Sequence, residues 1–269
     1  MSTSKLARLF AEIVGTFTLT AVTIAVSKNY GNPLFTTIAA AATLAGLVSV
    51  LGPVSGGHFN PAITLGFLSL KKIKFLEAIM FVAMQAVGAV LAWKLFEFLS
   101  PDRLITSVVN EFDWKVFAAE LVGMVVFSMG VAAVTYRKYI GGQAGATVGL
   151  SLFMGSVAVA VVVINRQLVT GVINPAVAIG VGYRPDSQGY LAYFFGPVVG
   201  AVVGMNLYRL FFSSDKVETV VATKSTSVPI VPSVSIAKEV AVSPKPSTAK
   251  VKATTKRATT KKVSPKSKK

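Results

Sequence analysis

Hydrophobic residues occur in six long runs along the chain, and short polar segments separate them. The runs cover residues 9–27, 34–51, 75–99, 116–136, 146–164 and 190–212. A transmembrane helix needs about 20 mostly apolar residues, and each run comes close to that length. The pattern therefore predicts an all-α membrane protein with six transmembrane helices.

Two shorter apolar segments interrupt this pattern, and both contain the letters Asn-Pro-Ala. They read "SGGHFNPAITLGF" at 55–67 and "TGVINPAVAIGVGY" at 170–183. Each is too short to span a bilayer. Pro suits the first turn of a helix and Asn suits the N-cap before it, so each segment predicts a half-helix that starts inside the membrane. The two motifs are Asn60, Pro61 and Ala62, and Asn174, Pro175 and Ala176.

The two halves of the chain resemble each other. "FAEIVGTF", with Glu12, is echoed by "FAAELVGMVVF", with Glu120, and each half has three spans with its Asn-Pro-Ala segment between the second and third. Because three is odd, the halves must cross the membrane in opposite senses. We therefore expect an inverted 3+3 repeat, with repeats at about 7–100 and 115–213, whose half-helices meet near the bilayer midplane.

Charge divides the chain into a channel-forming part and a tail. The net charge is +16, but thirteen basic and three acidic residues follow Ser214. The tail, 214–269, is rich in Lys, Pro, Ser and Thr, so we expect it to be disordered, beside a membrane domain at 1–213. Basic residues near 5–8, 71–74 and 137–138 fall on the same side as the tail, which predicts that both termini are cytoplasmic.

The paired motifs resemble those of the aquaporin, or major intrinsic protein, family. The resemblance rests on "AEIVGTF", "SGGHFNPAITLG", "AMQAVGAV", "AELVGMVVF", "INPA" and "FFGPVVGA". It implies six tilted helices, two half-helices, a pore in each subunit and a homotetramer. It also implies that Glu12 and Glu120 accept backbone amides of the re-entrant loops, and that Gln85 and His58 support the first loop. A proton relay through the acids and a pH gate at His58 are the alternatives.

The chain departs from the family pattern where the pore is expected to be narrowest. Most members have Arg after the second motif, whereas this chain has Val177. The resemblance places the other filter positions at Ala40, Val162 and Gly171, which predicts a wide, uncharged and apolar filter. Arg166, in the same loop, could substitute for the missing Arg. The glycerol-conducting branch of the family usually has Asp directly after that Arg. This chain has Ala178 there, which favours a water-type channel instead.

A wide filter predicts permeation by water and by small neutral solutes such as glycerol, urea, ammonia and hydrogen peroxide. A strictly water-selective channel and an ion-coupled secondary transporter are the alternatives. The sequence has no paired nucleophile and base and no metal-ligand cluster, so we expect neither an enzyme nor a cofactor. The basic tail predicts binding to anionic lipid or an acidic partner, with nucleic acid disfavoured.

Overall fold

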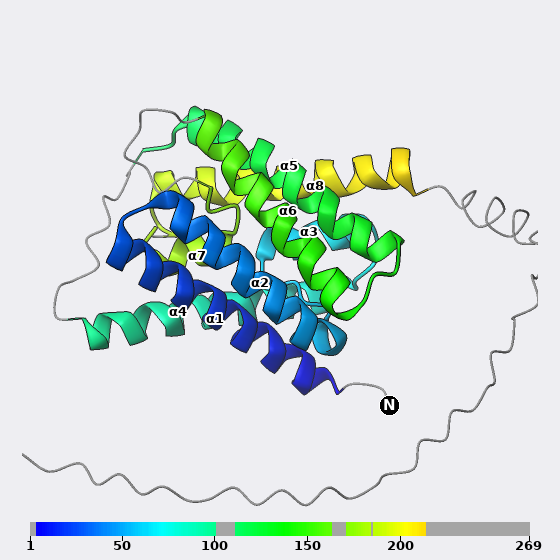
Figure 1. The fold of residues 1–269 in the computed structure, drawn as a ribbon, viewed down its shortest axis with the longest axis horizontal. Helices are drawn as coiled ribbons and strands as arrows, with labels where there is room; N and C mark the ends of the chain where they lie inside the picture. The colour runs from blue at the N-terminus through cyan, green and yellow to red at the C-terminus, as the bar shows by residue number, and fades with distance from the viewer. Residues whose placement is uncertain (1–3, 101–110, 163–170, 184, 214–269) are drawn as a thin grey trace, which may run out of the picture. The chain divides into compact units, whose positions relative to one another are not determined.

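The computed structural model describes residues 4–100, 111–162, 171–183 and 185–213, and the regular secondary structure of this part is helical. Six of its helices are long and apolar enough to cross a membrane. The predicted six-span, all-α architecture is therefore confirmed (Figure 1). These helices are α1 (Lys5–Tyr30), α2 (Pro33–Ser55), α4 (Phe75–Leu99), α5 (Trp114–Tyr136), α6 (Gly141–Val162) and α8 (Gln188–Phe212).

Several helices begin earlier than hydrophobicity alone predicts, because polar residues cap them. The hydroxyl oxygen of Ser4 accepts a hydrogen bond from the backbone N–H of Ala7, so α1 starts four residues before the apolar run. The side chain of Asn32 accepts from the N–H groups of Leu34 and Phe35 and starts α2. Such caps satisfy amide hydrogens that lack a partner within the helix.

The helices pack as two related sets of three. α1 packs against α2 and α4, and the equivalent α5 packs against α6 and α8. Each short helix also contacts long helices of the opposite half: α3 lies against α8, and α7 lies against α1 and α4. This exchange between the halves brings the two short helices together within the bundle (Figure 1) and completes the inverted repeat.

Glycines allow the closest helix contacts at equivalent places in the two halves. A Cβ atom at Gly88 of α4 would lie 2.5 Å from the carbonyl oxygen of Ile13, and one at Gly200 of α8 would lie 2.4 Å from that of Leu121. The sequence "VGAV" surrounds Gly88 and "VVGAVV" surrounds Gly200. Small residues of this kind let membrane helices approach backbone to backbone.

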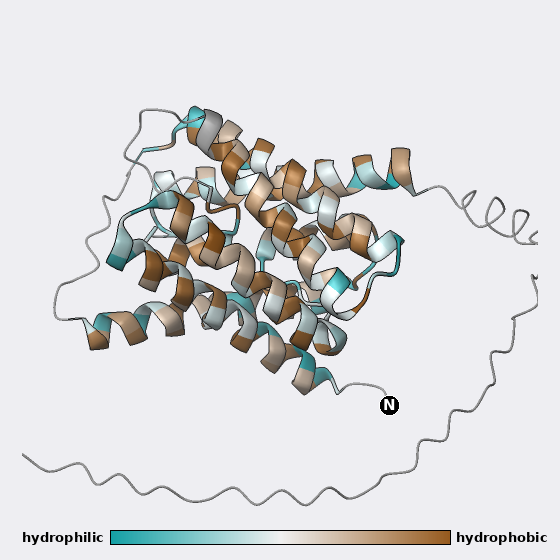
Figure 2. Cartoon of the chain, in the orientation of Figure 1, coloured by the Kyte–Doolittle hydropathy of each residue, from teal (hydrophilic) through white to brown (hydrophobic). Residues whose placement is uncertain are grey.

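The outer surface of the bundle is apolar. Hydrophobic residues fill the middle of the long helices, while hydrophilic residues gather near helix ends such as the α1–α2 turn (Figure 2). Large apolar side chains, including Leu150, Phe195 and Leu210, are exposed on this surface. A lipid bilayer or another subunit would cover such a surface. The tail predicted to be disordered, 214–269, lies outside the described residues.

Candidate functional site

The two short helices begin at the Asn-Pro-Ala motifs, as their residue types predict. α3 (Pro61–Ser69) and α7 (Pro175–Gly180) each have Pro in the first turn. Asn60 Oδ1 accepts a hydrogen bond of 2.9 Å from the N–H of Ala62, and Asn174 Oδ1 accepts one of 3.1 Å from the N–H of Ala176. Each Asn is therefore the N-cap of its half-helix.

The Asn side chains also join the two loops to each other. Asn60 Nδ2 donates to the carbonyl oxygen of Ile173 at 2.9 Å, and Asn174 Nδ2 donates to that of Phe59 at 3.0 Å. Each bond crosses from one repeat to the other. An amide NH₂ group has two hydrogens, so one hydrogen of each Asn is still available to a solute.

Phe59 and Ile173, which precede the two Asn residues, adopt backbone conformations that their side chains disfavour. Their φ angles are +45° and +35°, and both residues are fully buried. A bulky residue rarely has positive φ, and such a conformation persists only where the surroundings hold it. Here the carbonyl group of each residue is held by the opposite Asn.

The N–H groups of the same two residues are held by buried carboxylates. Glu12 Oε2 accepts a 2.8 Å bond from Phe59, and Glu120 Oε2 accepts a 2.6 Å bond from Ile173. The second oxygen of each Glu accepts from the preceding residue, His58 or Val172, at 3.2 and 3.1 Å. A carboxylate has room for several donors, so one acid can fix a whole turn of loop backbone.

The first loop has additional polar support around Glu12. Ser55 Oγ and Gln85 Nε2 donate to this carboxylate at 2.6 and 2.7 Å, and Gln85 Nε2 also lies 2.9 Å from Thr64 Oγ1. His58 Nδ1 lies 3.1 Å from the same Thr64 oxygen. The side chains of Glu12, Gln85 and His58 therefore form one connected polar network beneath the loop.

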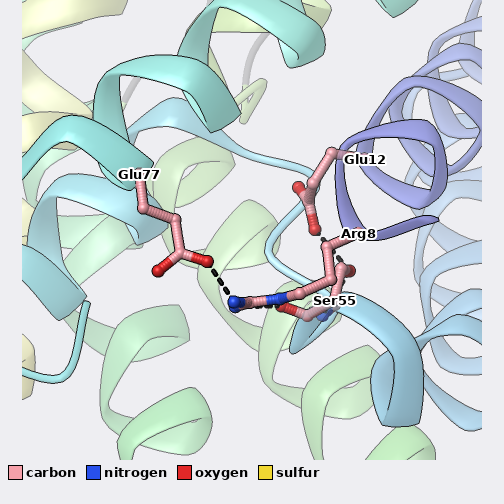
Figure 3. A network of polar contacts seen from close by, with 5 residues as sticks. Arg8, Glu12, Ser55 and Glu77 are labelled. Carbon is pink, nitrogen blue, oxygen red and sulfur yellow. Dashed lines mark hydrogen bonds and ion pairs between the residues drawn. The ribbon is translucent and has the colours of Figure 1, made fainter. Parts of the chain in front are cut away.

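A further contact set, which the sequence did not predict, surrounds the start of α1. Arg8 forms an ion pair with Glu77 of α4, and its Nη2 donates to the carbonyl oxygen of Ser55 at 3.4 Å (Figure 3). The guanidinium group also lies 5.3 Å from the centre of the Phe81 ring. The only available signal was a basic residue just before the first apolar run and an acidic residue at the start of the third, and their pairing depends on how α1 packs against α4.

A cavity of about 450 Å³ reaches from the α1–α2 turn to the two Asn-Pro-Ala motifs. Of the predicted filter residues, Ala40, Gly171 and Val177 line it together with Asn60 and Asn174. Within the described residues, no Lys, Arg, Asp or Glu lines its wall. Val162 ends α6, but its side chain lies outside the described part of the structure, as does Arg166.

A second cavity lies on the other side of His58 and is much smaller, at about 40 Å³. Both cavities are lined by Leu44, His58 and Phe127. Apolar residues such as Val131 and Val148 form most of the remaining wall of the smaller one. Of these two cavities, the one on the α1–α2 side is therefore much the larger.

Six membrane-spanning helices around two inward-facing half-helices, with a cavity that leads to their tips, define a multi-pass membrane channel. The chain matches the family "Major intrinsic protein" over residues 1–208. It therefore belongs to the major intrinsic protein family, whose members are channels and not enzymes.

Similar proteins include plant and animal members of this family. The chain is 30% identical to Nodulin-26 of Glycine max over 78% of this chain and 80% of that protein. It is 32% identical to Aquaporin NIP1-1 of Zea mays over 82% and 79% of the two chains. The solved structure of the aquaglyceroporin from Plasmodium falciparum has a TM-score of 0.57 and 18% identity, and covers 81% of this chain and 100% of that one, which supports the fold.

Proposed function

We propose that this passive channel conducts water and small neutral solutes, among them glycerol, urea, ammonia and hydrogen peroxide. One observation carries the proposal: in the described part of the structure, the cavity wall at the expected filter is formed by Ala40, Gly171 and Val177. Channel selectivity depends on width, hydrogen-bonding groups and fixed charge. Small apolar side chains widen the pore and leave it without a fixed positive charge, and the greater width admits a neutral solute that is larger than water.

Roles for the other residues follow from their contacts. Asn60 and Asn174 would bind passing oxygen atoms with their remaining amide hydrogens. Glu12, Glu120, Gln85 and His58 would hold the loops in place. Because loop amides occupy both carboxylate oxygens of Glu12 and of Glu120, a structural role for these acids is favoured over proton relay. This supports passive flow over ion-coupled transport.

Stopped-flow light scattering of proteoliposomes tests the solute range. Vesicles that contain the channel should shrink rapidly in an impermeant osmolyte and, when glycerol is the osmolyte, re-swell faster than protein-free vesicles. Val177→Arg is the matched variant, because it restores bulk, donors and positive charge at the filter. It should slow glycerol more than water. Wild-type vesicles that shrink without re-swelling would instead support the water-selective alternative.

We also propose an arrangement for the whole protein: a channel domain at 1–213, a basic tail at 214–269, both termini in the cytoplasm and a homotetramer in the membrane. The charge distribution supports the orientation. The exposed apolar side chains of α6 and α8, such as Leu150 and Val203, supply a surface for subunit contacts. The mass of the detergent-solubilised protein would test the tetramer.

A further inference from the structure

Three hydroxyl groups in the wall of the larger cavity already donate their hydrogens to the protein backbone. Thr23 Oγ1 of α1 donates to the carbonyl oxygen of Leu19 at 2.8 Å, and Thr36 Oγ1 of α2 donates to that of Asn32 at 3.1 Å. Ser156 Oγ of α6 donates to the carbonyl oxygen of Gly171 at 2.9 Å. All three residues line the cavity.

The direction of these bonds is certain, because a carbonyl oxygen can only accept. A hydroxyl group has one hydrogen and two lone pairs, so each of these groups has only lone pairs to offer to the cavity. At the filter itself, Ala40 and Val177 have no polar side-chain atom, and Val177 stands where an Arg would have provided donors. Between the mouth and the Asn residues, the hydroxyl groups of Thr23 and Ser156 therefore act as acceptors.

Donors lie at the base of the cavity and at its mouth. Asn60 and Asn174 each use one amide hydrogen in the crossed loop contacts and keep another for a solute. Ser27, Asn32 and Thr37 line the mouth, and their side chains can also donate.

A solute that enters from the α1–α2 side thus passes the acceptors Thr23 and Ser156 between two levels that have donors. Molecules with several O–H or N–H groups can bond to Thr23 and Ser156, whereas molecules with only acceptors lose contact at this level.

We propose that Thr23 and Ser156 are specificity-determining residues that make the pore between its mouth and the Asn residues favour neutral solutes rich in hydrogen-bond donors, such as small polyols. The inference rests on the proposed function, since it requires that solutes other than water enter. It assigns selectivity to one hydroxyl group of α1 and one of α6, in addition to the width of the filter. Thr23 is the residue to test, because its hydroxyl group is held in place by a 2.8 Å bond within α1 and the residue is only 8% exposed.

The test compares Thr23→Val with Thr18→Val in proteoliposomes. Both substitutions keep the shape of Thr and remove a 2.8 Å hydroxyl bond to the carbonyl oxygen four residues earlier in α1. Only Thr23 lines the cavity. Loss of one hydrogen bond to a permeating solute changes rates by about two- to tenfold. We therefore expect Thr23→Val to lower the ratio of glycerol to water permeability by that factor, and Thr18→Val to leave it near the wild-type value.

Two further arms separate hydrogen bonding from general polarity. Thr23→Ser keeps the hydroxyl and should keep the glycerol-to-water ratio within about twofold of wild type. Dimethyl sulfoxide, which has an acceptor and no donor, should not be slowed by Thr23→Val after subtraction of the flux through protein-free vesicles. If Thr23→Val slowed both glycerol and dimethyl sulfoxide, the proposal would be overturned. An unchanged ratio of glycerol to water permeability in Thr23→Val would overturn it as well.

The wild-type channel shows which proposal has failed. If it passes no glycerol above protein-free vesicles, the proposed solute range is wrong and this inference falls with it. If it passes glycerol and Thr23→Val passes glycerol and water in the same ratio, only the role of the hydroxyls is wrong.

Discussion

Phe59 illustrates how a single residue can depend on two distant parts of the chain. Its N–H is bound by Glu12 and its carbonyl by Asn174, so its unusual backbone is held at both ends. Its ring occupies the space beside Gly15 of α1: a Cβ atom at Gly15 would lie 2.2 Å from the ring carbon Cδ1. The loop before α3 therefore fits only if position 15 has no side chain.

We expect Gly15→Ala to destabilise the protein and reduce water permeability. Overpacking a dense interior costs about 1–3 kcal/mol, and the Phe59 ring has no free space to enter because it is fully buried. Gly46→Ala is the control: it lies in α2, with nothing within 4 Å of the added atom. Its effect should be neutral or slightly stabilising, by up to about 1 kcal/mol, because Ala is the better helix former. Thermal unfolding in detergent measures the stability of both variants. Equal midpoints for Gly15→Ala and Gly46→Ala would contradict the proposed contact between position 15 and the Phe59 ring.

At the scale of single residues, the sequence predicted the two caps but not the strained positions. Asn and Pro have local preferences that identify the start of a helix wherever they occur. Phe59 and Ile173 have preferences that argue against positive φ. Their conformation is imposed by bonds to Glu12, Glu120 and the opposite Asn, which are contacts across the fold.

At the scale of helices, the Arg8–Glu77 ion pair ties the start of α1 to the start of α4. Arg8 also contacts the end of α2 through the carbonyl oxygen of Ser55 (Figure 3). The side chains of Arg8 and Glu77 are 32% and 23% exposed, so water screens the pair only partly. Three helix ends next to the first re-entrant loop thus share one guanidinium group.

Replacing Glu77 should therefore cost more than replacing a similar residue in an exposed pair. Glu97, also in α4, pairs with Lys94 at 2.6 Å, and those side chains are 45% and 58% exposed. Exposed pairs contribute about 0–1 kcal/mol. We expect Glu97→Gln to leave the unfolding midpoint in detergent almost unchanged. Glu77→Gln should lower the free energy of unfolding by about 1–3 kcal/mol, and the midpoint with it, since Arg8 loses its charged partner. A larger effect at Glu97 would contradict this view of the two pairs.

Hydrophobic length was enough to predict the number of long helices, but it did not predict their ends. α1, α2 and α6 each begin before the predicted run, and at α1 and α2 polar caps set the first residue. α7 is only six residues long, although the apolar letters continue beyond it. The helix ends there because Gly182 has a φ angle of +106°, which an α-helix cannot contain.

At the scale of the whole molecule, the inverted repeat was predictable from the sequence. The unequal sizes of the two cavities were not. Matching motifs in each half identify an inverted pair of units without any knowledge of packing. The large and small cavities depend instead on which faces of α2, α5 and α6 point inward. Those helices are apolar on all sides, so their sequences carry little information about how each helix is rotated about its own axis.

At this scale, basic residues also gather at one end of the bundle. The start of α1, the loop after α3, the α5–α6 turn and the end of α8 all lie at one end of the bundle, on the right in Figure 1. α8 ends at Phe212 at this end of the bundle, which also carries Lys5, Lys72 and Lys138. If this end is cytoplasmic, we expect the tail that follows α8 in the sequence to meet the leaflet that is rich in anionic lipid.

A vesicle-binding experiment tests this placement and the tail's partner together. The full chain in neutral-lipid nanodiscs should capture vesicles that contain phosphatidylserine, because basic residues near such a surface contribute about 1 kcal/mol each. A chain that ends at residue 213 should not capture them, and its water permeability should equal that of the full chain. Added salt should release the vesicles, since screening weakens contacts between exposed charges. Capture that persists in the shortened chain would assign the binding to the helix-end lysines, and tighter capture of nucleic acid than of vesicles would exclude lipid as the preferred partner.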